Sequence, residues 1–444
     1  MLTAGRLRAE AFADPVARRA GLRPCSRRAS LLLNFLRPAW RSSAWRRKVR
    51  APLTRACWAV VLTTFSTCRR VFSDRFRKRS IWTPACSRMS WPGSRCALLF
   101  TRKVTPAGGL ACGNQRSLAG IRYRQGMKVG IMIEGQEGLT WERWFRIADR
   151  VEALGLDSLW RSDHFVSLMG HPERPALEAW VSLTALAART KQMRFGPLVS
   201  PITFRHPALL ARMAAGVDLL SNGRLVLGLG AGWNQHEHDA YGIGLPPMKE
   251  RFDRLEEAIA VIRALWQGGP VDAPGRYYPL RGATLNPRPL QQPGPPLLIG
   301  GDGEKRLLRI VAEHADEWNS HAAGPDLYRT KRAKLEEHCR AVGRNPEEIR
   351  RSWMGGLVIA EDARGLDERA RWFKAFYTAV TDVDERSVLT ELRARSWVVG
   401  TPEQVGEQLQ AWQAAGVDRV MFQYYDLEDL DGLELVARVA RAVA

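Results

Sequence analysis

The feature that most constrains the fold is a regular alternation of short apolar runs and amphipathic helical segments through residues 127–444. Runs with strand character lie at 128–133, 157–161, 193–199, 224–229, 296–299, 317–320, near 353–359 and at 417–422. Helical segments separate them, and the longest repeats apolar residues at three- and four-residue spacing from Phe252 to Trp266. Eight strand–helix units in one chain predict a (β/α)8 TIM barrel, which typically takes about 250 residues before insertions.

Two segments interrupt this alternation. Residues 268–295 are rich in proline and glycine and predict an irregular excursion, whereas 362–396 are polar and helical, without a clear strand, and predict an insertion. Thr401 and Pro402 then supply an N-cap and a first-turn proline for the next helix. The chief alternative, a doubly wound open sheet, should carry phosphate-binding glycines after its first strand. The sequence after Ile133 is Glu-Gly-Gln-Glu-Gly, so the barrel is favoured.

Residues 1–126 form a basic leader that differs sharply from 127–444. The leader holds 27 of the 67 Lys and Arg residues, 3 of the 46 Asp and Glu residues, and six of the seven cysteines. Its composition predicts that the leader is non-globular. It is expected either to be disordered or to result from a translation start that was wrongly assigned upstream of Met127. A targeting peptide and a phosphate-binding arm for nucleic acid are the alternatives. The cysteines contain no closely spaced pair of the kind that binds zinc.

The segment 127–444 contains the seventh cysteine, Cys339, and therefore cannot form an internal disulfide. This cysteine usage is typical of a reducing cytoplasm. No stretch approaches the roughly 20 apolar residues that a membrane-spanning helix requires. We therefore expect a cytoplasmic domain that binds a small molecule, without membrane contact and with nucleic-acid binding only through the leader.

Active sites of such barrels lie at the C-terminal ends of the strands, so the residues just past each strand are the candidates. They are 162–165, 200–203, 230–234, 300–303 and 318–319. The turn at 300–303 gives the strongest signal, because its three glycines leave backbone N–H groups open to an anion before a helix. Lys305 and Arg306 are expected in the first helical turn and favour a nearby negative group. A connection that needs glycine only for tight turning is the alternative.

The turn after the fourth predicted strand carries Gly228, Gly230 and Gly232. It is not a dinucleotide fingerprint, because Trp233 occupies the position of the third glycine. In a barrel it can still let a flat ring or a phosphate approach the backbone. Trp233 could line that pocket, although a packed core indole is equally consistent with the sequence.

His164 is the candidate for proton transfer or ring positioning, with Asp163 expected to orient it. A structural histidine is the alternative reading. The cluster 236–239, His-Glu-His-Asp, suggests metal ligation, but histidines two residues apart diverge on a helix and no zinc spacing is present. No metal site is predicted.

Taken together and in order, these motifs resemble the luciferase-like monooxygenase superfamily, in particular its deazaflavin-dependent oxidoreductase branch. The motifs are Ser162-Asp163-His164-Phe165, Pro201-x4-Arg205-His206-Pro207, Ser221-x-Gly223-Arg224-x3-Gly228-x-Gly230-x-Gly232-Trp233, Gly300-Gly301-x-Gly303-Glu304-Lys305, Ala315-Asp316-x-Trp318-Asn319 and Val399-Gly400-Thr401-Pro402. The resemblance spans essentially all of 127–444 and does not reach the leader.

The resemblance implies a barrel that binds coenzyme F420, a 5-deazaflavin, or FMN in sister branches. Asp163 and His164 would then meet the ring, and a non-prolyl cis peptide near 197–199 would support its back face. The implied cofactor-binding residues are Pro197, Leu198, Val199, Ser200, Gly230, Gly232, Trp233, Gly300, Gly301, Gly303 and Trp318, the glycines at 300–303 holding the phosphate. Homodimers are usual in this family.

The resemblance has one departure. Deazaflavin-dependent sugar-phosphate dehydrogenases place a catalytic Glu where this chain has Trp233. The leading hypothesis is an F420-dependent oxidoreductase that transfers hydride to or from a small organic substrate, which the sequence does not identify. The alternatives are an FMN-dependent monooxygenase using dioxygen, a non-catalytic flavoprotein, and nucleic-acid binding through the leader.

Overall fold

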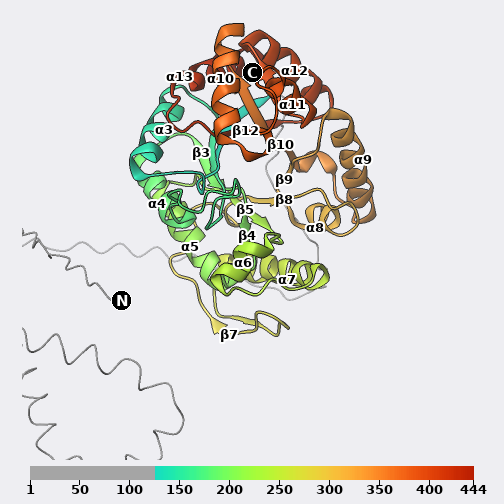
Figure 1. The fold of residues 1–444 in the computed structure, drawn as a ribbon. Helices are drawn as coiled ribbons and strands as arrows, with labels where there is room; N and C mark the ends of the chain where they lie inside the picture. Colours follow the sequence, from blue (N-terminus) through green and yellow to red (C-terminus); the bar gives the residue numbers. More distant parts are fainter. Residues whose placement is uncertain (1–125) are drawn as a thin grey trace, which may run out of the picture. The chain divides into compact units, whose positions relative to one another are not determined.

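The computed structural model describes residues 126–444 (Figure 1). Predictions about the leader therefore fall on residues 1–125, outside the described part of the chain. Within 126–444, no helix is long and apolar enough to cross a membrane.

The strands form a parallel barrel surrounded by helices (Figure 1). Its strands are β1 (Lys128–Ile133), β2 (Ser158–Arg161), β3 (Arg194–Pro197), β4 (Ser200–Pro201), β5 (Leu227–Gly230), β8 (Leu297–Gly300), β9 (Glu317–Ser320), β10 (Arg350–Ile359) and β12 (Arg419–Tyr424). They follow the order β3-β2-β1-β12-β10-β9-β8-β5-β4. The predicted third strand, 193–199, contains β3, and the turn predicted after it contains β4. The Leu198–Val199 peptide, which is cis, lies between β3 and β4. The Val226 amide donates to the Phe195 carbonyl at 2.9 Å and joins β3 to the residues just before β5, which brings the sheet round on itself. The predicted barrel is confirmed.

Helices alternate with the strands and pack on the outside of the barrel. They are α3 (Trp141–Ala153), α4 (Ala179–Arg189), α5 (Pro207–Leu220), α7 (Met248–Gln267), α8 (Leu307–His314), α9 (Pro325–Ala341), α12 (Pro402–Ala414) and α13 (Asp431–Val443), with a 3-10 turn η4 (Pro346–Glu348). The short helix α6 (Gln235–Tyr241) instead lies beside the C-terminal ends of the strands. The predicted cap of α12 is present, because Thr401 and Gln404 form a reciprocal capping box.

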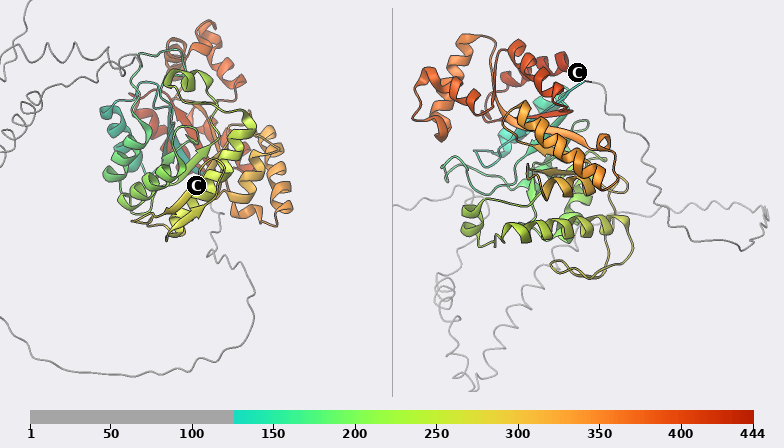
Figure 2. Two further views of the ribbon diagram at one scale, coloured as in Figure 1. Left: turned by 90° about the horizontal axis from the view of Figure 1, so that it is seen from below. Right: turned by 90° about the vertical axis from the view of Figure 1, so that its right-hand side faces the viewer.

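The two predicted interruptions have different outcomes. The excursion at 268–295 is more regular than expected, since β6 (Val271–Ala273) and β7 (Leu280–Ala283) pair as an antiparallel hairpin. The insertion is helical as predicted and contains α10 (Ala363–Phe376), η5 (Thr378–Val380), η6 (Glu385–Ser387) and α11 (Val388–Ala394). It leads into β11 (Val398–Gly400), which pairs with the far end of β10. Figure 2 shows the insertion as orange and red helices that stand beside the barrel helices.

Apolar side chains fill the inside of the barrel, where Met132, Trp160, Leu198, Leu298 and Met421 form one buried cluster with Val226. The barrel is therefore a packed core and not a pore, as in other folds of this type.

A buried ion cluster closes the N-terminal end of the barrel. Arg419 is fully buried, with its Nη1 2.6 Å from Glu317 Oε2 and its Nε 2.8 Å from Asp157 Oδ2. Burial opposes the charge on Arg419, but both carboxylates outweigh it and raise the pKa of the guanidinium. The cluster therefore lies at the opposite end of the barrel from the residues that follow the strands.

Candidate active site

His164 follows β2 at the C-terminal end of the barrel, where the sequence places it. Its Nδ1 lies 2.8 Å from Oε2 of Glu237, whose side chain is 0% exposed. Burial disfavours the imidazolium, but the hydrogen bond and negative charge of Glu237 outweigh burial and raise the pKa of His164. The Nε2 atom has no hydrogen-bond partner among residues 126–444. His164 therefore presents one free ring nitrogen, backed by a buried carboxylate on the other.

Glu237 reaches this position because Asn234 begins α6 beside the strand ends. The Asn234 side chain accepts a hydrogen bond from the Glu237 amide and caps the helix. The second carboxylate oxygen of Glu237 accepts the backbone amide of Phe165. Burial raises the pKa of Glu237, yet its bonds to His164 and to the loop more than offset this and lower the pKa. An ionised Glu237 thus fixes both the imidazole and the loop that carries it.

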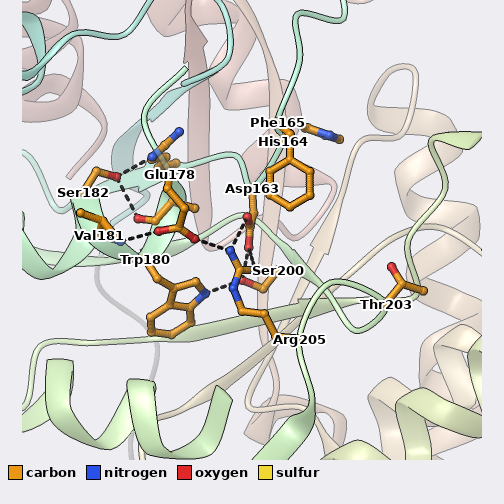
Figure 3. Close-up of polar contacts among 12 residues, drawn as sticks. Asp163, His164, Phe165, Glu178, Trp180, Val181, Ser182, Ser200, Thr203 and Arg205 are labelled. Atoms are coloured by element: carbon orange, nitrogen blue, oxygen red, sulfur yellow. Dashed lines mark hydrogen bonds and ion pairs between the residues drawn. The ribbon is translucent and has the colours of Figure 1, made fainter. Parts of the chain in front are cut away.

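Asp163 does not orient His164, contrary to expectation. Its Oδ2 accepts from Arg205 Nη1 at 2.5 Å and from the Ser200 hydroxyl at 2.7 Å. Figure 3 shows Asp163 directed toward Arg205 and Ser200 and away from the His164 side chain. Arg205 also pairs with Glu178, so the network ties the loops after β2 and β4 to the start of α4. The physical reason is competition, because a guanidinium satisfies a buried carboxylate better than a neutral ring does. Asp163 is a positioning residue for the loops.

The segment 197–200 contains the cis peptide that the family resemblance implies, between Leu198 and Val199. Leu198 is buried in the barrel core, and Ser200 is fully buried with its hydroxyl bonded to Trp180 and Asp163. Pro197 is buried as well, in β3. Val199 is partly exposed, so its side chain and the local backbone are the parts of this segment open to a ligand.

Glycine is required at position 230 for a steric reason that the sequence alone does not show. A Cβ at Gly230 would lie 2.7 Å from Cγ2 of Val199, and one at Gly300 would lie 3.1 Å from Cγ1 of the same residue. Both glycines make room for Val199, so the Gly230 side-chain position is closed to a ligand.

Gly232 and Trp233 form the rim of the mouth. Gly232 has a φ of +80°, and its carbonyl accepts a hydrogen bond from Arg251. The next residue, Trp233, is 65% exposed, and its ring centroid lies 5.8 Å from that of His164 in an edge-on arrangement. The alternative of a packed core indole is therefore wrong for Trp233. An open indole beside the imidazole is suited to covering a ligand.

The glycine turn at 300–303 lies at the same end of the barrel. Gly301 has a φ of +130°, and a Cβ there would lie 2.5 Å from Leu307 Cδ2. The amides of Asp302, Gly303 and Glu304 have no hydrogen-bond acceptor within the described chain. The helix begins at Leu307, so Lys305 and Arg306 precede it and do not form its first turn as predicted. Arg306 is paired with Asp253 and Glu256, whereas Lys305 is exposed beside the open amides.

Trp318 is not placed to contact a ligand, contrary to expectation. It is 0% exposed and stacks on Tyr328 of α9 at 5.1 Å between ring centroids. The physical reason is the period-two alternation of β9, which sends Asn319 into the barrel and Trp318 toward the helices. The Trp318 Nε1 donates to the Gly301 carbonyl at 2.9 Å, so it holds the glycine turn in place.

Two acidic groups at the mouth were missed as site residues. The sequence offered Glu237 only as part of a metal cluster, but His238 bonds Thr203 and the Asn234 carbonyl instead. Among residues 126–444, no group of three or more His, Cys, Asp or Glu is arranged to hold a metal. Glu134, directly after β1, is 7% exposed and accepts hydrogen bonds from Gln136 and Gln423. Because Glu134 directly follows a predicted strand, its position in the sequence could have identified it as a candidate site residue.

A family model described as luciferase-like monooxygenase matches residues 127–419. The chain belongs to the luciferase-like monooxygenase family. This membership confirms the resemblance drawn from the motifs.

Relatives and solved structures of the family fall into two cofactor groups. The protein named F420-dependent glucose-6-phosphate dehydrogenase from Mycolicibacterium fortuitum is 37% identical over 301 residues, which cover 62% of this chain and 86% of the relative. An F420-dependent secondary alcohol dehydrogenase, solved with an F420–acetone adduct, has a TM-score of 0.60 at 22% identity, covering 72% and 100% of the two chains. The oxygenating constituent of 3,6-diketocamphane monooxygenase from Pseudomonas putida, solved with FMN, has a TM-score of 0.59 at 18% identity, covering 72% and 99%. The two structures confirm the fold.

Proposed function

We propose that this member of the luciferase-like monooxygenase family is an F420-dependent oxidoreductase that transfers a hydride between the deazaflavin and a small organic substrate. The observation that carries the proposal is the 37% identity to a relative named an F420-dependent dehydrogenase, sustained over 86% of its length. The site agrees with it, because an anion-binding turn and a proton-transfer group lie at the same end of one barrel.

The residues of the glycine turn fit the phosphate of such a cofactor. Three consecutive amides, from Asp302 to Glu304, lack acceptors within the described chain, and Lys305 is exposed next to them. Backbone N–H groups ahead of a helix are a common phosphate site. A side chain at Gly301 would collide with Leu307, so the turn depends on glycine at that position.

The ring would lie between Val199 and Trp233. Val199 is the partly exposed member of the cis-peptide segment, and Trp233 offers an open indole on the rim. Gly232, between the rim and the β5 strand end, brings the backbone close to this space. Pro197, Leu198 and Ser200 would support the ring through their backbone, since their side chains are buried.

When bound, the cofactor supplies an acceptor or donor of hydride at C5. His164 holds or releases the substrate's hydroxyl proton at Nε2, the ring nitrogen without a hydrogen-bond partner in the described part of the chain. Glu237 stabilises the imidazolium that forms when His164 takes this proton. Asp163, through Arg205 and Ser200, keeps the loop under His164 in place.

An FMN-dependent monooxygenase is the second candidate function. The observation that favours it is the fold shared with an FMN-bound monooxygenase component at a TM-score of 0.59. A phosphate and a flat tricyclic ring are common to both cofactors, so the same turn and rim would accept either. The reaction would then use dioxygen and reduced flavin in place of hydride exchange with the substrate.

Partners and location follow from the same proposal. We place the protein in the cytoplasm, where Cys339, buried and unpaired, would stay reduced. We also propose a homodimer, as is usual in this family, and no role for nucleic acid outside the leader.

Turnover separates the two candidates. The purified full chain is mixed with oxidised F420 and a panel of alcohols and sugar phosphates, and loss of deazaflavin absorbance is followed. A parallel reaction supplies reduced FMN and dioxygen and follows oxygen uptake beyond the uncatalysed rate. We expect F420 reduction that falls by about 100-fold or more in His164→Ala. Oxygen uptake coupled to substrate oxidation, without F420 reduction, would contradict the proposal.

A further inference from the structure

The glycine turn at 300–303 is joined to the end of β9 by the side chain of Asp302. Its Oδ1 accepts a hydrogen bond from the Ser320 hydroxyl at 2.5 Å, and its Oδ2 accepts the backbone amide of His321 at 3.1 Å. The His321 ring lies on the same carboxylate, with its Nδ1 2.9 Å from Oδ2. A histidine is therefore held directly beside the turn whose open amides we assign to the cofactor phosphate.

Three carboxylates around the turn are neutralised by permanent cations. Oε1 of Glu304 lies 2.7 Å from Nζ of Lys331 in α9. Asp253 and Glu256 of α7 both pair with Arg306. Lysine and arginine keep their charge throughout the neutral pH range, so these pairs contribute a constant charge at the turn.

Asp302 differs from these carboxylates, because its cationic partner is a histidine. The hydrogen bond that Asp302 accepts raises the pKa of His321, and this effect outweighs burial of the ring and the nearby charge of Lys331, which oppose the imidazolium. The pair of Asp302 and His321 is neutral when the imidazole is protonated and carries one negative charge when it is not. Titration of one side chain therefore changes the net charge beside the open amides.

A second histidine touches the turn without forming such a pair. His338 of α9 has its Nε2 2.8 Å from the carbonyl oxygen of Glu304 and makes no ion pair with a carboxylate among residues 126–444. It is therefore a suitable comparison for His321.

The pair of Asp302 and His321 contributes little to the stability of the fold. The His321 side chain is 65% exposed, and exposed ion pairs are weak in water. Its effect is instead local, because Asp302 supplies both a carboxylate and one of the open amides of the turn. An uncompensated carboxylate at this place would repel a phosphate.

We propose that His321 is a positioning residue for the cofactor, which neutralises Asp302 beside the phosphate-binding amides and so makes the affinity for F420 depend on pH. The inference rests on the proposed function and concerns the regulation of its cofactor site. Protonated His321 leaves the phosphate facing the open amides and Lys305, whereas neutral His321 exposes the phosphate to the charge of Asp302. The affinity is therefore highest at low pH and falls as the pH rises through the pKa of His321.

The test is a fluorescence titration of the full chain with F420 at several pH values across the range in which histidine titrates. The quantity compared is the Kd of His321→Gln divided by the Kd of the parent, since titration of the cofactor itself cancels in this ratio. We expect a ratio of about 3 to 10 at the low end of the range, because one positive charge near the phosphate is lost, and a ratio near 1 at the high end. A ratio that stays the same at every pH would overturn the inference.

Asp302→Asn tests the same pair with the opposite sign. At high pH it should bind F420 about 3- to 10-fold more tightly than the parent, because a carboxylate that repels the phosphate is removed. Weaker binding by Asp302→Asn would mean that the pair only supports the turn, and the inference would fall. His338→Gln is the matched control and should keep the pH dependence of the parent; loss of the dependence in this variant would assign it to the wrong histidine.

Histidine NMR supplies a readout that needs no turnover. The ring resonance of His321, identified by its absence in His321→Gln, is titrated with pH in the full chain with and without F420. Because linkage is reciprocal, F420 should raise the pKa of His321, and an unchanged pKa would refute the proposal. These contrary results all leave F420 bound. Failure of the proposed function is different, since the parent would then bind no F420 at any pH and the inference would fall with it.

Discussion

Replacing Glu237 by Gln should change the pH dependence of the reaction in a direction that the structure fixes. Burial lowers the pKa of His164, and the hydrogen bond and charge of Glu237 more than compensate for it. Once the charge is removed, burial dominates and the pKa falls. A charge-assisted hydrogen bond stabilises by about 1.5–3 kcal/mol, which corresponds to a roughly 10- to 100-fold change in the ratio of imidazolium to imidazole at fixed pH.

The direction in which the pH profile of kcat/KM shifts follows from the role of His164 as a base during alcohol oxidation. Neutral imidazole accepts the proton, so kcat/KM rises with pH through the pKa of His164. In Glu237→Gln this rising limb should move to lower pH, while the plateau falls because the imidazole is a weaker base. The assay is kcat/KM for F420 reduction across the range in which histidine titrates.

Glu178→Gln is the matched control for this experiment. It makes the same change of charge in a residue that pairs with Arg205 and makes no hydrogen bond to His164. Its rising limb should coincide with that of the parent. If Glu237→Gln instead lowers activity by the same factor at every pH, Glu237 only supports the loop and the account of the pair is refuted.

Three further substitutions test the scaffold around the site. Arg419→Ala leaves two buried or half-buried carboxylates without their main partner and should cost about 3–5 kcal/mol, seen by calorimetry as a fall in Tm of about 10 °C; a fall below about 2 °C would argue against it. Gly301→Ala should lower the free energy of unfolding by about 1–3 kcal/mol, because of the positive φ of Gly301 and the collision of the new Cβ with Leu307. Gly303→Ala is the control and should keep the parent Tm, because a Cβ there makes an ordinary contact at 3.4 Å. Equal Tm values for the two variants would contradict this reasoning. Trp318→Phe loses one hydrogen bond to Gly301 and should weaken F420 binding by about 2- to 10-fold in a fluorescence titration, with an unchanged Kd as the contrary result.

The barrel was predictable because its strands are short apolar runs separated by well-marked helices. Strands 128–133 and 317–320 agree residue for residue with β1 and β9. The hairpin of β6 and β7 was not predictable in the same way, because Gly and Pro are frequent in its segment and the two strands are only 3 and 4 residues long. The division of β3 from β4 rests on a peptide geometry that the residues themselves do not indicate; the family resemblance supplied it.

In the candidate site, the positions of residues at the mouth could be predicted from the sequence, but their hydrogen-bond partners could not. Position along the chain placed His164 and the glycine turn at the mouth, since both directly follow strands. Partners could not be read from position, because Glu237 and Arg205 come from other loops, 73 and 42 residues from the groups they bind. Trp318 is different, since the alternation along β9 already directs Asn319 inward and could have shown that Trp318 faces the helices.

A deazaflavin held by the glycine turn at 300–303 and by Trp233 on the rim of the mouth is what the proposed function requires. The most direct measurement is a fluorescence titration of the full chain with F420 and, separately, with FMN, repeated with Gly301→Ala. We expect micromolar F420 binding that is weakened about 10-fold or more by Gly301→Ala, with FMN bound more weakly. Tight FMN binding together with no detectable binding of F420 would contradict it.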